Sequence, residues 1–314
     1  MPTLTIITGD ITRVEADAIV NAANTRMRGG GGVDGAIHRA GGRAILDDCI
    51  ARFPHGLAVG DAGWTTAGDL PARHVIHTVG PNYGAGQRDR SLLESCYRRS
   101  LQVADELAAR SVAFPLISAG VYRWPIDNAV AAAVDTVTAT PTVVEEVSLV
   151  AFTGQLAEKM RAYRQIATPL RIIQGLREVH RLGYGEVRFV PYLYALGTWR
   201  IEISTADNVR ETDPHPRVGG DAATIRYSSA AGGEFAGGVV TGATPVREVA
   251  DLILAQLPQA TRRGGSARYA QWLDELATIC LDRRAVPIAF DDYGGVPEGR
   301  WKLSDGGSVL PPPE

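Results

Sequence analysis

Short apolar runs alternate with helix-like patterns through the first 167 residues of the chain. The runs 3–8 and 17–22 are bounded by polar or glycine-rich segments and predict buried strands. Strands are also predicted near 61–66, 74–79, 112–117 and 147–152, and helices over 34–53, over 89–110, from Pro125 onward and over 155–167. This alternation predicts a layered α/β sandwich around a largely parallel sheet. In such folds the ligand crevice lies at the carboxyl ends of the strands.

The pattern changes after Thr168-Pro169, where we place a domain boundary. Beyond it, helices are predicted over 170–182, about 245–256 and 267–281, and strands near 186–190, 198–204 and 223–229. The order indicates an α+β arrangement rather than an alternating one. We therefore expect a first domain over 1–168, a second over 169–303 containing a long loop at 205–222, and a flexible tail over 304–314.

Composition and charge narrow the class of protein. The chain has 314 residues, 45% hydrophobic and 21% charged, which is typical of a globular protein of two domains. The most apolar stretch, 129–144, is interrupted by Asp135 and Pro141, so no membrane span is predicted. Because no secretory signal precedes the first strand, a cytoplasmic location is expected. A net charge of −3, without a basic half, makes extended nucleic-acid binding an unexpected function.

The cysteines and histidines do not suggest a metal centre. Cys49, Cys96 and Cys280 are far apart, and no cysteine or histidine stands beside them at metal-ligand spacing. We expect them to be reduced residues of the core. His38, His74 and His77 are interpreted as residues that support the fold, so no metal and no cofactor are expected.

A glycine-rich loop follows the second predicted strand. Asn21-Ala22-Ala23-Asn24 is followed by Gly29-Gly30-Gly31-Gly32-Val33-Asp34-Gly35 at the start of a helix that Asp34 is expected to cap. Such a loop can hold a phosphate with backbone N–H groups. The run also satisfies the dinucleotide motif G-x-G-x-x-G. A dehydrogenase fits poorly, since the turn is too long and no ribose-binding acid follows at the expected distance.

Three other strands end in residues that could contact a ligand. Ser118-Ala119-Gly120-Val121-Tyr122 follows one of them and could clamp a pyrophosphate from the side opposite the glycine loop. Asp10 could accept a hydrogen bond from the exocyclic amine of a base, or could cap a turn with Thr12. Phe152 could stack on a base or lie in the core.

Together these motifs resemble the macrodomain family of ADP-ribose-binding modules. The resemblance covers roughly residues 3–167 and rests on several separated motifs in the right order: Gly9-Asp10-Ile11-Thr12, Asn21 to Asn24, Gly29 to Asp34, Leu70-Pro71-Ala72, Val75 to Pro81 and Gly120-Val121-Tyr122. Within this family the chain most resembles the hydrolase subgroup, which comprises the bacterial O-acetyl-ADP-ribose deacetylases and the MacroD-type ADP-ribosyl hydrolases. The family fold is a three-layer α/β/α sandwich with a mixed sheet. Residues 169–303 resemble no family that we can name.

The resemblance implies a role for each candidate residue. Asp10 and Ile11 would contact adenine, and Phe152 would stack on it. The diphosphate would be held by residues of both loops, namely Gly32, Val33, Ser118, Ala119, Gly120 and Val121. Tyr122 would line the distal ribose, while Asn24 and Asp34 would orient that ribose and the attacking water.

The implied activity is hydrolysis by a positioned water, without a metal. The substrates would be O-acetyl-ADP-ribose or proteins carrying ADP-ribose on acidic side chains. A macrodomain branch that uses a covalent lysine is excluded by this interpretation, because the first lysine is Lys159, in the last predicted helix of the domain. The alternative is a non-catalytic reader that binds ADP-ribose and recruits the second domain to modified targets.

Overall fold

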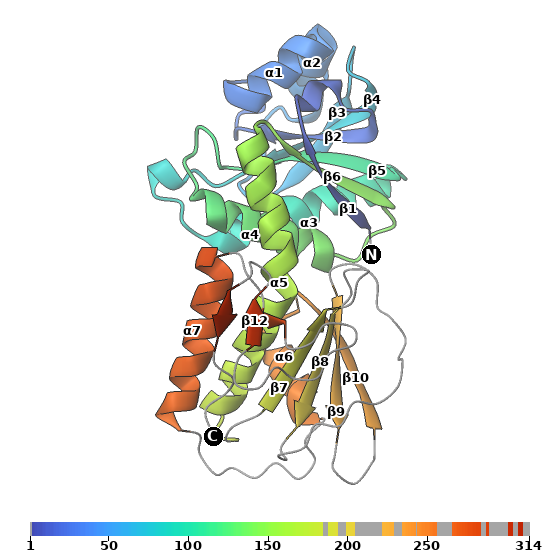
Figure 1. Cartoon of the computed structure of the whole chain (residues 1–314). Helices are drawn as coiled ribbons and strands as arrows, with labels where there is room; N and C mark the ends of the chain where they lie inside the picture. The colour runs from blue at the N-terminus through green and yellow to red at the C-terminus, as the bar shows by residue number, and fades with distance from the viewer. Residues whose placement is uncertain are drawn as a thin grey trace. The chain divides into compact units, whose positions relative to one another are not determined.

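The computed structural model describes residues 2–184, 188–193, 199–204, 222–228, 234–242, 244–255, 266–283, 287–288, 301–303 and 307–309 (Figure 1). The chain divides into two compact units, residues 1–161 and 162–314. Every candidate site residue lies in the first unit.

The first unit is built on one six-stranded sheet. Its strands are β1 (Thr3–Thr8), β2 (Ala16–Ala23), β3 (Ala62–Thr66), β4 (Ala72–Val79), β5 (Ser111–Pro115) and β6 (Glu146–Ala151). The strand order is β1-β6-β5-β2-β4-β3, and all neighbours pair in parallel except β3 with β4. The predicted strands are confirmed to within two residues at either end, and so is the mixed, largely parallel sheet.

Helices cover both faces of this sheet (Figure 1). They are η1 (Ile11–Arg13), α1 (Gly32–Gly41), α2 (Arg43–Arg52), η2 (Tyr83–Ala85), α3 (Arg90–Glu106), α4 (Ile126–Ala139) and the start of α5 (Gly154–Arg181). Ile37 of α1 and Ile45 of α2 share a core cluster with Ile19 and Val75 of the sheet. Phe114 follows Ala113 on β5 and points to the other face of the sheet. Its ring centroid lies 5.5 Å from that of Tyr97 in α3. The three-layer α/β/α sandwich is therefore confirmed.

The segment predicted as one helix over 34–53 contains two helices, which are separated at Gly42. This residue separates α1 from α2 and has φ +76°, in the left-handed region that favours glycine. The prediction that Asp34 caps the helix is wrong. The N-cap is Gly31, and Asp34 is the third residue of α1, where its side chain contacts other groups.

The strand order sets the order of the loops along one edge of the sheet. Because β1, β6, β5, β2 and β4 are parallel, their carboxyl ends lie at the same edge. The segments that follow them begin with Gly9-Asp10, Phe152, Leu116, Asn24 and Gly80, in that spatial order. The sheet thus arranges Asp10, Phe152, the 118–122 loop and the glycine loop along a single line.

The two helices predicted on either side of Thr168-Pro169 are one helix, which corrects that expectation. Helix α5 continues through Pro169 to Arg181 and so crosses the division between the units. A proline inside a helix removes one backbone hydrogen bond, but it ends the helix only where packing does not compensate. The domain boundary at Thr168-Pro169 remains a prediction.

The described residues of the second unit form two sheets and two further helices. One sheet has the order β10-β9-β8-β7 and the other β11-β12-β13. Their strands are β7 (Arg188–Leu193), β8 (Trp199–Ser204), β9 (Ala222–Ser228), β10 (Glu234–Thr241), β11 (Pro287–Ile288), β12 (Trp301–Leu303) and β13 (Ser308–Val309). The helices are α6 (Val246–Ala255) and α7 (Ala267–Arg283), close to their predicted ranges.

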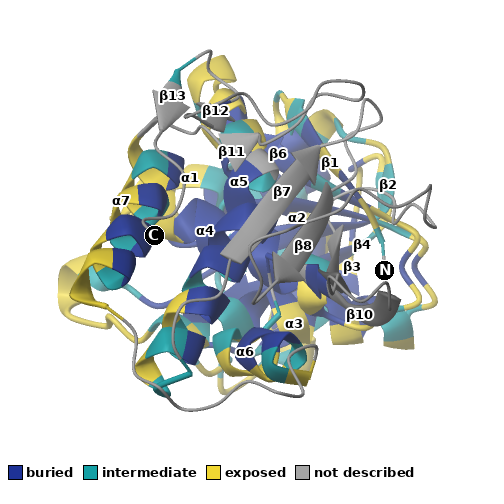
Figure 2. Ribbon diagram, turned by 60° about the horizontal axis from the view of Figure 1, so that its bottom comes forward, coloured by how far each residue is buried: buried dark blue, intermediate teal, exposed yellow. Residues whose placement is uncertain are grey.

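Helix α7 has one buried and one exposed side (Figure 2). Tyr269, Trp272, Leu273 and Leu276 recur at helical spacing and are all buried, so they form the core-facing side of this helix. Strand β13 falls inside the range predicted as a tail, while the loop predicted at 205–222 lies outside the described residues except for its last position. Within the described part of the chain, no helix combines the length and hydrophobicity that crossing a bilayer requires.

Candidate functional site

Asp34 is a buried carboxylate at the first turn of α1. It is 4% exposed, and its Oδ1 accepts a hydrogen bond of 2.7 Å from Nδ2 of Asn21. His38, one turn later on α1, places Nε2 3.4 Å from the same oxygen. Burial raises the pKa of the Asp34 carboxyl above its usual value, although the bonds from Asn21 and Asn24 and the charge of His38 act in the opposite direction.

Asn24 stands beside the second oxygen of Asp34. Its Nδ2 is 3.4 Å from Asp34 Oδ2 and donates to the carbonyl of Gly29 at 2.8 Å. Its Oδ1 accepts from the backbone N–H of Arg26 at 3.0 Å, which fixes the orientation of the amide. Asn24 and Asp34, which the family resemblance implies as the residues that orient the water, are therefore neighbours beyond the end of β2.

Glycine is required next to this pair by close packing. A Cβ on Gly30 would lie 2.9 Å from Asp34 Oδ2 and 3.2 Å from Asn24 Nδ2, and one on Gly35 would lie 2.5 Å from the carbonyl of Gly30. Gly31, the N-cap, has open space around its Cβ position. Glycine at positions 30 and 35 therefore allows the loop backbone to pack closely around the Asp34 carboxylate.

The 118–122 loop lies across from the glycine loop. A Cβ on Gly32 would be 3.5 Å from Cγ2 of Val121, whose side chain is exposed. Ser118 is buried with φ +62°, and among the described residues its Oγ has no hydrogen-bond partner. Tyr122 is half-buried, and burial followed by the charge of Asp34 raises the pKa of its hydroxyl. Gly32 and Val121 thus bring the two loops next to each other, and the binding of a diphosphate between Gly32, Val33 and residues 118–121 remains a prediction.

The base-binding candidates lie at the other end of the same edge. Asp10 Oδ1 accepts from the backbone N–H of Thr12 at 3.0 Å and from its hydroxyl at 2.8 Å, so the turn-cap interpretation is confirmed. These two bonds lower the pKa of Asp10. Ile11 is buried, whereas Phe152 is 81% exposed and is therefore not a core residue. An exposed ring at the end of β6 suits stacking on a planar ligand.

A second set of polar side chains lies behind Asp34. Asn21 Nδ2 is also 3.0 Å from Nδ1 of His77, and His77 Nε2 is 2.8 Å from Oγ1 of Thr65. All three side chains are fully buried. Burial lowers the pKa of His77 to about 3, so the imidazole is neutral. Asn21, His77 and Thr65 were not predicted as site residues from the sequence. The available signal was a polar residue within each of three buried strands, which needs a partner.

Cys49 lies close to two histidines that could bind a metal ion, His38 and His77, which corrects the expectation from the sequence. Its Sγ is 3.6 Å from His77 Nε2, and the ligand atoms of His38, Cys49 and His77 all lie within 4.8 Å of one another. Burial raises the pKa of the Cys49 thiol to about 12, and both ring nitrogens of His77 already face Asn21 and Thr65. A cation here would need an ionised thiolate and a released histidine nitrogen. Absence of a metal requirement remains a prediction.

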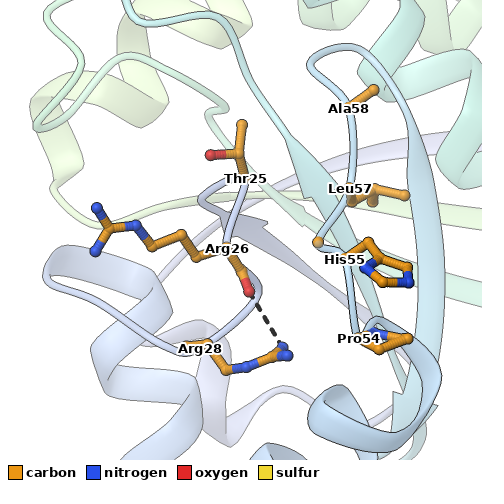
Figure 3. A pocket seen from close by; sticks show the side chains of 8 residues that line it. Thr25, Arg26, Arg28, Pro54, His55, Leu57 and Ala58 are labelled. Atoms are coloured by element: carbon orange, nitrogen blue, oxygen red, sulfur yellow. Dashed lines mark hydrogen bonds between the residues drawn. The ribbon is translucent and has the colours of Figure 1, made fainter.

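A cavity of about 610 Å³ lies on the far side of the Asn24 loop (Figure 3). Thr25, Arg26 and Arg28 line one side, and residues 54–58 line the other. The Arg26 side chain points away from the 54–58 segment, whereas Arg28 Nη1 donates to the carbonyls of Arg26, Met27 and Phe53, each at 3.1 Å. The Leu57 N–H donates to the Thr25 carbonyl at 3.0 Å. This segment therefore supports the backbone that carries Asn24.

A family model and several known proteins are similar to the part of the chain that contains most of this site. The family model described as "Macro domain" matches residues 20–133. The Macro domain-containing protein in sno 5'region of Streptomyces nogalater is 59% identical over 156 residues, covering 48% of this chain and 86% of that protein. O-acetyl-ADP-ribose deacetylase 1 of Pantoea vagans is 47% identical over 161 residues, covering 49% of this chain and 94% of that protein.

A solved structure of the Oceanobacillus iheyensis macrodomain with ADP is 37% identical to this chain. The match covers 51% of this chain and 88% of the Oceanobacillus iheyensis chain, with a TM-score of 0.48. The relatives just described match over nearly their whole length, at identities well above those of chance similarity. The chain belongs to the macro domain family.

Proposed function

We propose that the first unit binds ADP-ribose along the sheet edge and hydrolyses groups attached to its distal ribose. The order of the strands supports this placement. Asp10 and Phe152 would hold the adenine over β1 and β6, and the two loops would enclose the diphosphate over β5 and β2. The distal ribose would then lie beside Asn24, Asp34 and Tyr122. Substrates would be O-acetyl-ADP-ribose or proteins modified on acidic side chains.

The observation that carries the proposal is the contact between Asn24 and the buried carboxylate of Asp34. Binding alone requires the loops but no carboxylate close to a dianionic diphosphate, where it would repel the ligand. A carboxylate whose pKa is raised by burial is suited to accept a proton from water. The name of the Pantoea vagans relative supports the deacetylase part of the proposal.

The mechanism follows from these positions. A water held between Asn24 and Asp34 Oδ2 attacks the electrophilic carbon at the distal ribose end. Its oxygen forms the new bond to that carbon, the bond to the leaving oxygen breaks, and one proton of the water passes to Asp34. In the acetyl ester Asp34 returns this proton to the leaving ribose oxygen, whereas a side-chain carboxylate leaves as the anion. Positioning and preorganised dipoles supply most of the acceleration, and the free N–H groups at the α1 N-terminus stabilise the phosphates.

Asp34→Ala tests the proposal when turnover and ADP-ribose affinity are measured on one preparation. We expect turnover to fall by at least 100-fold while calorimetric affinity stays within a few-fold, because the backbone donors of both loops survive. Wild-type protein should be assayed on O-acetyl-ADP-ribose and on proteins modified at Asp/Glu, Ser or Arg. Binding of ADP-ribose without turnover of any of these would make the protein a reader, and near-normal turnover by Asp34→Ala would refute the role of Asp34.

A further inference from the structure

We infer that His77 is a positioning residue, which acts through Asn21 to hold the Asp34 carboxylate in place for the attack by water. The inference rests on the proposed function. It comes from a line of three buried side chains, Thr65, His77 and Asn21, that begins on β3 and ends at Oδ1 of Asp34.

The sheet brings these side chains to one face. Asn21 on β2 is paired in register with His77 on β4, and Thr65 on β3 is paired with Val75, two residues before His77. Side chains two residues apart on a strand point to the same face. Ile19 and Val75 pack in one cluster with Ile37 and Ile45, so this is the face covered by α1 and α2. Asp34 projects from α1 onto the end of the line.

Counting hydrogens gives every bond a direction. The single hydroxyl hydrogen of Thr65 is donated to the carbonyl of Thr66 at 2.9 Å, so toward His77 its Oγ1 acts as an acceptor. His77 therefore carries its hydrogen on Nε2 and has a bare Nδ1. Nδ1 accepts one N–H of the Asn21 amide, and the second N–H of that amide is directed at Asp34.

This orientation leaves the carbonyl oxygen of Asn21 buried. Among the described residues, Asn21 Oδ1 has no hydrogen-bond partner, a state that proteins rarely tolerate. The opposite orientation of the amide would place that oxygen against two acceptors, His77 Nδ1 and Asp34 Oδ1. The bare nitrogen of His77 thus decides which end of the amide faces the carboxylate, and the fold keeps an unsatisfied carbonyl as a result.

The effect on Asp34 is both geometric and electrostatic. Anchoring Oδ1 at 2.7 Å leaves Oδ2 directed toward Asn24, where the water is proposed to bind. A donor to the ionised form also opposes the rise in pKa that burial causes. The other titratable groups that face Asp34 are His38 on α1, Cys49 on α2 and Tyr122 after β5. The Cys49 thiol and the Tyr122 phenol remain neutral near pH 7. The contact through which His77 acts on Asp34 is the hydrogen bond from the Asn21 side-chain amide.

The first test replaces the distal end of the line in the full-length protein. Thr65→Val removes the acceptor for His77 Nε2–H with little change in volume, whereas Thr65→Ser retains it. With Val, the imidazole gains nothing from carrying its hydrogen on Nε2 and can shift it to Nδ1, where it opposes the Asn21 N–H. We expect kcat to fall about 10- to 100-fold for Thr65→Val at unchanged KM, and to stay within about threefold for Thr65→Ser. Ile76→Val, on the same strand as His77, controls for a small loss of packing.

The second test exchanges the acceptor itself. In His77→Asn a carbonyl oxygen can take the place of Nδ1, while His77→Gln carries its polar group to the position of Nε2 and lacks the acceptor for Asn21. We expect the Asn variant to keep more kcat than the Gln variant. A residue that only fills space would give the reverse order, because glutamine is closer in size to histidine. That reverse order would overturn the inference.

A spectroscopic readout separates this inference from the proposed function. Proton–nitrogen NMR correlation of the histidine rings should show wild-type His77 with hydrogen on Nε2 and bare Nδ1. Carbon-13 titration should show a higher pKa for Asp34 in Thr65→Val than in Thr65→Ser. If the wild-type protein hydrolyses none of the substrates, the proposed function fails. These two measurements still test whether His77 positions Asp34 through Asn21. Hydrogen on Nδ1 in wild type, or an Asp34 titration equal in both Thr65 variants, would overturn it.

Discussion

Replacing Gly56 by alanine tests how the 54–58 segment holds the loop that carries Asn24. Gly56 has φ +78°, and a Cβ at this position would lie 2.0 Å from the carbonyl oxygen of Thr25. That oxygen accepts the Leu57 N–H at 3.0 Å. The added methyl group therefore meets backbone rather than a flexible side chain, and the Thr25 peptide must move away by about 1 Å or more to reach ordinary C···O separations of roughly 3.3 Å.

Two costs add in this variant. A residue with a Cβ in the left-handed region costs about 1–2 kcal/mol relative to glycine. Losing the Leu57–Thr25 bond costs about 1 kcal/mol more. We expect Gly56→Ala to lower the free energy of unfolding by about 2–3 kcal/mol, in the upper part of the range of common single-residue effects.

Gly86→Ala is the matched control. Gly86 has φ +89°, but no atom lies within 4 Å of its Cβ position. This variant carries the conformational cost alone, about 1–2 kcal/mol. Denaturant unfolding of both variants measures the difference, and equal losses would show that the contact with Thr25 does not constrain the backbone.

Activity gives the second readout. Asn24 precedes Thr25, and its amide lies 3.4 Å from Asp34. A shift of about 1 Å at this point can cost on the order of 100-fold in turnover when reacting groups are held in a fixed geometry. We expect Gly56→Ala to lose 10- to 100-fold in kcat below its unfolding transition, with Gly86→Ala close to wild type. Wild-type turnover in folded Gly56→Ala would refute the coupling between this segment and the site.

Four further outcomes are expected. Because burial raises the pKa of Asp34 above its ordinary 3.8, the ionised form destabilises the fold at neutral pH; Asp34→Asn should unfold at higher temperature than wild type at pH 7.5, and this gain should shrink toward pH 4.5. Asp10→Ala should weaken ADP-ribose by about 1–3 kcal/mol and reduce the preference for the adenosine over the inosine form, whereas equal wild-type affinity for both forms would leave Asp10 a turn cap only. Residues 1–168 alone should fold and turn over O-acetyl-ADP-ribose within about twofold of the full chain, since every candidate residue lies between Asp10 and Phe152; a folded but inactive fragment would assign later residues to the site. EDTA should leave the rate unchanged, and strong inhibition would direct attention to the His38, Cys49 and His77 cluster.

Local patterns predicted the first unit well because each of its elements carries its own signal. The run 3–8 alternates exposed and buried side chains, which is a strand signal of its own, and Gly42 ends a helix through its own backbone conformation. Motif order also placed Asn24 and Asp34 in one site before their contact was seen. These features depend on residues close together in sequence or on one recognisable motif.

Features that depend on tertiary packing were missed. Asp34 was expected to cap its helix, as acids often do, but its carboxylate instead accepts from Asn21, thirteen residues away on a strand. Cys49 lacks ligands nearby in sequence, yet helix α2 carries it to within 3.6 Å of His77, 28 residues later. Pro169 suggested a break because local sterics disfavour it within a helix, and tertiary context overrides that preference in α5.

The order of strands in the sheet also has a consequence for synthesis of the protein. Strand β1 is made first, but in the described structure its only strand partner is β6, about 140 residues later in the chain. At translation rates of roughly 5–20 residues per second, β1 waits on the order of ten seconds for its partner to emerge. Pairings so distant in sequence form slowly. The part of the sheet edge that carries Asp10 and Phe152 is therefore completed late, so a ribosome that stalls before residue 146 leaves a chain with an unpaired, aggregation-prone first strand.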